Sequence, residues 1–103
     1  MNPLRLATAA RSLSPATRFL VALFEATQAL ESDDARALGA RLRANALAAA
    51  EGLLAGGTEA LAGASRLREL SFAIEIARRL GYLDLGTAAE LLAHAAIAAA
   101  SAG

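Results

Sequence analysis

Cysteine and lysine are both absent from these 103 residues, and only two prolines, Pro3 and Pro15, occur. Without cysteine the chain can form neither disulfides nor thiolate metal sites, which favours a reducing compartment. No uncharged run of eighteen apolar residues is present, and the apolar run at the start is too short for a secretory signal. These absences predict a cytoplasmic protein that does not span a membrane.

Charge of one sign is not in excess either. Ten arginines and ten acidic residues give a formal net charge of zero. A neutral total provides no attraction of the whole molecule to nucleic acid or to a membrane surface. Binding of either kind must therefore come from a local patch, and a membrane contact of the Arg-bearing first residues is kept as a minor alternative.

Alanine supplies nearly a third of the residues, and β-branched residues are scarce. This composition has a high helix propensity along almost the whole chain. The length suits one domain with a single core. We therefore predict an all-α fold, with residues 14–103 forming an antiparallel up-down four-helix bundle and residues 1–13 forming an N-terminal extension or a short helix.

Helix start and stop signals divide the bundle into four segments. Ser14 before Pro15 predicts the start of a first helix, which we expect to end near Glu31. Its predicted apolar stripe contains Phe19, Leu20, Leu23, Phe24, Thr27 and Leu30.

A second helix is predicted to begin at the capping and acidic residues 32–34 and to end at Gly56-Gly57, which we interpret as a turn. Its expected inward positions include Leu38, Leu42, Ala49 and Leu53, with either Asn45 or Ala46 between them. An inward Asn45 would need a partner for its amide, and an exposed Asn45 is an equally good alternative.

The third and fourth helices follow from similar signals. The third is predicted from Thr58 to Leu80, where Gly81 has the position of a left-handed turn. The fourth is predicted to open with a capping box formed by Thr87 and Glu90 and to run to about Ala100.

The third helix has a wider apolar face than one core needs. Its core stripe is expected to contain Leu67, Leu70, Ile74, Ala77 and Leu80. A second stripe, Phe72, Ala73 and Ile76, is the candidate interface for another copy of the chain or for a partner protein. The alternative is that an alanine-rich neighbouring helix buries both stripes within one chain.

The same helix carries a sequence resemblance. Residues 69–84 have the sequence ELSFAIEIARRLGYLD, and residues 50–52 have the sequence AEG. Both resemble the four-helix-bundle proteins encoded in intervening sequences of bacterial 23S ribosomal RNA genes, a family that includes the accessory variability determinant of diversity-generating retroelements. The resemblance extends over about residues 33–100. It implies a non-enzymatic homo-oligomeric ring, commonly a pentamer, whose retroelement members bind a reverse transcriptase and its template RNA through basic surfaces.

Four arginines form the candidate RNA site. If the second and third helices are antiparallel neighbours, Arg43 lies near Arg68 and Glu69, Arg41 lies within about one turn, and the group is completed by Arg66. Guanidinium groups suit phosphate oxygens, and few aromatic side chains are available for base stacking, so we expect contacts to the RNA backbone. The alternative is a charged face paired with acidic residues of a neighbouring subunit.

Two further arginines are assigned to structural roles. Arg78 and Arg79 are expected opposite Asp33 and Asp34, as salt bridges between helices. Glu75 also precedes Arg79 by four residues, the favourable orientation for a pair along one helix.

Signals for catalysis are poor. Glu90 and His94 are four residues apart, so a metal or acid–base pair is geometrically possible, but no second motif completes a site. No nucleophile motif and no phosphate-binding glycine loop is present. We predict a non-enzyme without catalytic residues, metal or cofactor. The main alternative to an RNA-binding scaffold is a homo-oligomeric interaction module without a nucleic-acid partner, and a metal-dependent enzyme is a remote third.

Overall fold

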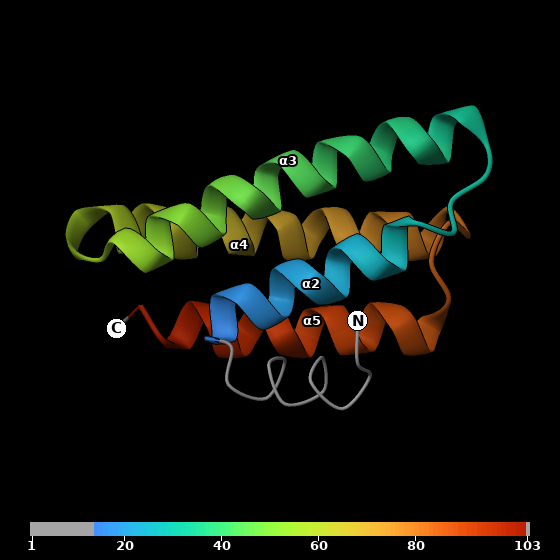
Figure 1. The fold of residues 1–103 in the computed structure, drawn as a ribbon. Helices are drawn as coiled ribbons and strands as arrows, with labels where there is room; N and C mark the ends of the chain where they lie inside the picture. The colour runs from blue at the N-terminus through green and yellow to red at the C-terminus, as the bar shows by residue number, and fades with distance from the viewer. Residues whose placement is uncertain (1–13, 103) are drawn as a thin grey trace, which may run out of the picture.

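Four α-helices make up almost all of residues 14–102, the part of the chain that the computed structural model describes (Figure 1). In chain order they are α2 (Pro15–Thr27), α3 (Asp33–Ala55), α4 (Gly57–Arg79) and α5 (Leu85–Ala100). No strand occurs in these residues. The prediction of an all-α chain with four helices is confirmed for this range, whereas the prediction for residues 1–13 concerns residues outside it.

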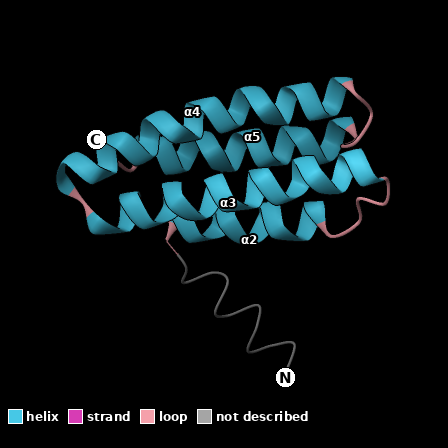
Figure 2. Ribbon diagram, turned by 90° about the horizontal axis from the view of Figure 1, so that it is seen from above, coloured by secondary structure: helices cyan, strands magenta, loops and turns pink. Residues whose placement is uncertain are grey.

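The helices surround one core. Each helix packs against its neighbours in the chain, and α2 also packs against α5, so α2 and α4 occupy diagonally opposite corners (Figures 1 and 2). The helix ends that each short connection joins lie at the same end of the molecule (Figure 1). This arrangement gives every helix two packed sides and one side that faces outwards.

Large side chains in the core come mainly from three of the helices. The largest fully buried ones are Phe19 and Leu23 of α2, Leu67 and Ile74 of α4, and Leu91 of α5. Each such side chain stabilises the fold by about 1.5–3 kcal/mol relative to an exposed position. The buried residues of α3 are smaller, since apart from one leucine they are alanines and a glycine.

Small residues let α3 and α4 approach closely. A Cβ atom added to Gly63 would lie 2.7 Å from the carbonyl oxygen of Ala49, and one added to Gly52 would lie 2.7 Å from that of Glu59. Both obstacles are backbone atoms, which cannot rotate away. The two helices can therefore keep this separation only while both positions lack a side chain.

Two helix starts agree with the sequence prediction. The Ser14 hydroxyl accepts a hydrogen bond from the Thr17 N–H at 3.3 Å, and the Ser32 hydroxyl accepts one from the Ala35 N–H at 3.1 Å. Each bond satisfies one of the free N–H groups of the first turn. The predicted starts of α2 and α3 are thus confirmed.

The predicted capping box of the last helix is wrong. α5 already begins at Leu85, and its cap is the Asp84 carboxylate, which accepts a hydrogen bond from the Thr87 N–H at 2.7 Å. That bond holds the pKa of the Asp84 carboxyl below its usual value. Thr87 is therefore inside the first turn and receives the cap.

Two other expectations for α2 are corrected. The helix ends at Thr27, before the predicted Glu31, because residues 28–32 form the connection that leads to the cap of α3. Phe24 is 39% exposed although it was placed in the apolar stripe. It follows the buried Leu23 directly, which puts it about 100° further round the helix.

Leu80 is also outside the core, with 58% of its surface exposed. α4 ends at Arg79, and Gly81 adopts a left-handed conformation with φ +81°. The Tyr82 N–H then donates to the Ala77 carbonyl oxygen at 2.9 Å. This turn directs the chain towards α5 and leaves Leu80 on the surface.

Gly63→Ala should destabilise the bundle by about 1–3 kcal/mol, because the new methyl group forces α3 and α4 apart. Gly86→Ala is the matched control, since its Cβ would meet only a side-chain oxygen at 3.5 Å and the change should gain helix propensity. Urea unfolding followed by circular dichroism measures both. A Gly63→Ala protein as stable as the wild type would contradict the close backbone contact.

Candidate functional site

The outward side of α4 carries three exposed large apolar side chains among polar and charged ones. Leu61 is 62% exposed, Phe72 is 71% exposed and Ile76 is 38% exposed. Their spacing of eleven and four residues puts them on one side of the helix, and we call this set the α4 face. Two of the three predicted interface residues, Phe72 and Ile76, belong to it. Ala73, the third, is half-buried and turns towards α3.

Two of the four candidate RNA-binding arginines lie together. A hollow of about 100 Å³ between α3 and α4 is lined by Arg41, Asn45, Arg66 and Glu69 among apolar side chains. Arg66 Nη1 donates to Asn45 Oδ1 at 3.2 Å, so Asn45 is an exposed residue with a partner on the next helix. Arg41 forms no ion pair within residues 14–102.

The other two arginines point elsewhere. Arg43 is half-buried, and its Nη1 donates to the Thr27 hydroxyl of α2 at 2.9 Å. Arg68 is exposed on the side of α4 that carries Phe72, one turn away. Residues two apart on a helix are separated by about 200°, so neither Arg43 nor Arg68 can share the hollow that Arg41 and Arg66 line.

Acidic side chains border the same groove. A second hollow, of about 270 Å³, continues along α3 and α4, and Arg66 lines it together with Glu51 and Glu59. With Glu69 in the first hollow, the groove holds more carboxylates than guanidinium groups. Its electrostatics within one chain are therefore mixed, which differs from the strongly basic group that the sequence predicted.

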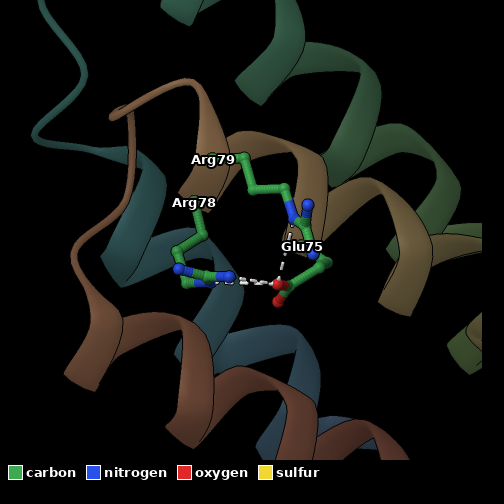
Figure 3. A network of polar contacts seen from close by, with 3 residues as sticks. All are labelled: Glu75, Arg78 and Arg79. Carbon is green, nitrogen blue, oxygen red and sulfur yellow. Dashed lines mark hydrogen bonds and ion pairs between the residues drawn. The ribbon is translucent and has the colours of Figure 1, made fainter.

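A small polar network lies at the C-terminal end of α4. Arg78 Nε donates to Glu75 Oε1 at 3.1 Å, Arg78 Nη2 binds the same oxygen, and Arg79 Nε lies 3.6 Å from it (Figure 3). The Arg78 hydrogen bond is the main cause that lowers the pKa of Glu75. The predicted Glu75–Arg79 pair is present. The predicted salt bridges to Asp33 and Asp34 are wrong, because both guanidinium groups turn back to their own helix (Figure 3).

The remaining chemical candidate, Glu90 with His94, has little support from the geometry. Glu90 is exposed, His94 is half-buried, and within residues 14–102 no group of three or more His, Asp and Glu side chains could hold a metal ion. A hollow of about 250 Å³ between α2 and α5 includes Glu25, Thr87 and Glu90 but not His94. This hollow therefore does not bring Glu90 and His94 together.

A membrane-spanning helix is absent from the described residues, since none there is both long enough and apolar enough.

Comparisons with known proteins do not assign this chain to a family. No family model matches this chain, and neither does any curated protein or solved structure. The resemblance of residues 69–84 to the intervening-sequence proteins therefore stays a prediction. What the described residues do provide is a helix side with three exposed apolar side chains beside a groove of mixed charge.

The contact between Arg43 and Thr27 was not foreseen from the sequence. Thr27 is the one buried polar side chain among the described residues, and its hydroxyl also donates to the Leu23 carbonyl oxygen at 2.9 Å. A threonine at the next helical repeat after Phe19 and Leu23 was a signal for a buried hydroxyl that would need a partner. Arg43 therefore has a structural role in the packing of α2 on α3.

Arg43→Glu should lower the free energy of unfolding by about 1–2 kcal/mol, because it removes a charged hydrogen-bond donor from the Thr27 hydroxyl. Arg41→Glu makes the same charge change two residues away and should stay within about 0.5 kcal/mol of the wild type. Thermal and urea unfolding compare the two variants. Equal stability of both would show that the Arg43 contact contributes nothing to the fold.

Proposed function

We propose that this chain is a non-enzymatic, cytoplasmic scaffold whose antiparallel up-down bundles assemble into a homo-oligomer through the α4 face. The observation that supports this proposal is the exposure of Phe72, at 71%, together with Leu61 and Ile76. Large apolar side chains exposed on one side of a helix are typical of an interaction site. The resemblance to the intervening-sequence proteins suggests a ring, commonly of five subunits.

Phe72→Arg should dissociate the assembly, because it places a charge at the centre of the buried apolar contact. We expect a loss of about 2 kcal/mol or more per interface, which is about thirtyfold in affinity. Leu85→Arg is the matched control, since Leu85 is 69% exposed but belongs to α5. Sedimentation velocity at micromolar concentration should find a multiple of the monomer mass for the wild type and for Leu85→Arg only.

The proposal is overturned if the wild type sediments as a monomer at these concentrations. It is also overturned if Phe72→Arg keeps the wild-type mass while its circular dichroism is unchanged.

A second candidate function adds a nucleic-acid partner. The resemblance suggests an accessory protein that holds a reverse transcriptase and its template RNA, and Arg41 with Arg66 is the local feature that favours it. Neither guanidinium group is held by a carboxylate within the described residues, so both remain able to bind phosphate oxygens. Repetition of this pair around an oligomer would multiply weak contacts to one RNA backbone.

Arg41→Glu with Arg66→Glu should abolish retention of a structured RNA in a filter-binding titration. Arg36→Glu with Arg79→Glu makes the same change in net charge outside the groove and should retain most of the binding. Wild-type binding should weaken when salt rises from about 50 mM to about 200 mM, since phosphate contacts release counterions. If the wild type does not bind RNA at the lower salt concentration, the RNA-binding function is overturned. The function is then that of a homo-oligomeric module without a nucleic-acid partner.

A further inference from the structure

The α4 face lies between two charges of opposite sign. Arg68 and Glu69 precede Phe72 by four and three residues, so they lie about 40° and 60° from it, on opposite sides. Glu69 is on the side next to α3, where it lines the hollow between α3 and α4, and Arg68 is therefore on the side next to α5. Both are exposed, and neither forms an ion pair within residues 14–102.

The three apolar side chains of the α4 face form one row between these charges. Leu61 lies about 20° round the helix from Phe72, and Ile76 lies about 40° from it on the other side. The row extends from residue 61 to residue 76, about 22 Å along the helix axis. A second helix that lies along the row would cover all three side chains.

The other charged residues of α4 leave this row open. Glu75 and Arg79 lie on the same side as Arg68, and they pair with each other, since Arg79 Nε is 3.6 Å from Glu75 Oε1. Arg79 is the last residue of α4, so it lies beyond the apolar row. The remaining charged residues lie about 120° or more round the helix from Phe72, and these are Glu59, Arg66 and Arg78.

Two copies of α4 can meet along this row in an antiparallel direction, but neither simple register suits the side chains. In an antiparallel two-fold pair, each flank of the row meets the same flank of the other copy. A pair that places Leu61 opposite Ile76 has its centre at residues 68 and 69, so Arg68 meets its own copy. A pair centred on Phe72 places Leu61 beyond the last residue of the other α4, where it stays exposed.

A parallel two-fold pair has neither defect. Each flank of the row then meets the opposite flank of the other copy, and Leu61, Phe72 and Ile76 each meet their own copy. Arg68 of each chain lies beside Glu69 of the other chain, one residue apart along the axis. Of these three arrangements, only the parallel pair covers the whole row and also places opposite charges in contact.

We propose that two copies of this chain pair in parallel through their α4 faces, with Arg68 of each copy against Glu69 of the other. This inference rests on the self-association proposed above and names how the copies meet. Because both copies use the same face, the contact closes at two copies. A ring of bundles would need a further surface besides the α4 face.

Single cysteines test the direction of the pair, because the chain has none of its own. Leu61→Cys and Ile76→Cys both retain Phe72, and each should form a disulfide-linked dimer on mild oxidation, since a disulfide needs Cα atoms within about 7 Å of each other. Leu85→Cys is the matched control, because Leu85 is 69% exposed but lies on α5, and it should stay unlinked over the same time. Non-reducing electrophoresis measures the linked fraction.

Charge reversal tests the ionic contact. Arg68→Glu places two carboxylates at each contact and should weaken the dimer about tenfold in sedimentation velocity. Arg68→Glu combined with Glu69→Arg restores opposite charges between the copies and should return the dissociation constant to about the wild-type value. A double variant as weak as the single one would overturn the pairing of these two residues.

The outcomes separate this inference from the proposal on which it rests. A wild type that is monomeric at micromolar concentration overturns both. A wild type that assembles while neither cysteine variant links to its own copy overturns only the parallel pairing. A disulfide that forms only when Leu61→Cys and Ile76→Cys are mixed does so as well, because it shows the antiparallel arrangement.

Discussion

The close contact between α3 and α4 is the constraint on which the rest of this structure depends. Gly52 and Gly63 put a Cβ position within 2.7 Å of backbone oxygen on the facing helix, and alanine supplies most of the remaining buried positions of α3. A core bounded on one side by alanine has room for few large side chains. The larger core side chains therefore come mainly from α2, α4 and α5.

The chain has both a well-packed core and exposed aromatic side chains. Phe19 and Phe72 are chemically the same, yet Phe19 is 1% exposed and Phe72 is 71% exposed. Phe72 lies about 200° around α4 from both Leu70 and Ile74, which are buried, so it faces away from the core. An aromatic ring exposed in this way is suited to a contact with another molecule, which is why Phe72 is central to the proposed self-association.

Sequence patterns were sufficient for the fold class, for the starts at Ser14 and Ser32 and for the exposed stripe on α4. They failed where a choice depended on three-dimensional neighbours. Thr87 and Glu90 satisfy the capping-box pattern, but Asp84, three residues earlier, is also a favourable N-cap residue and is the cap in the structure. Leu80 continues the apolar period and is exposed only because α4 has already ended.

The predicted grouping of the four arginines was wrong for a different reason. The sequence numbers placed Arg41, Arg43, Arg66 and Arg68 at one level along the bundle axis. A level gives the position of a residue along its helix, but it does not give the side of the helix on which the residue lies. A separation of two residues turns a side chain to the far side of the helix, so only alternate members of such a group can meet. That rule was available from the sequence alone and would have divided the four arginines in advance.

Charge and assembly are connected at the groove between α3 and α4. Ala73 lines the hollow that contains Arg41 and Arg66, and it follows Phe72 directly. A second copy seated on the α4 face would therefore lie at the edge of this groove and add its own charges to it. Within one chain the carboxylates of Glu51, Glu59 and Glu69 offset the two arginines, so a single bundle gives phosphate little attraction. Under the proposed self-association, the charge of the groove would depend on the neighbouring copy, so the proposed nucleic-acid binding depends on the proposed assembly.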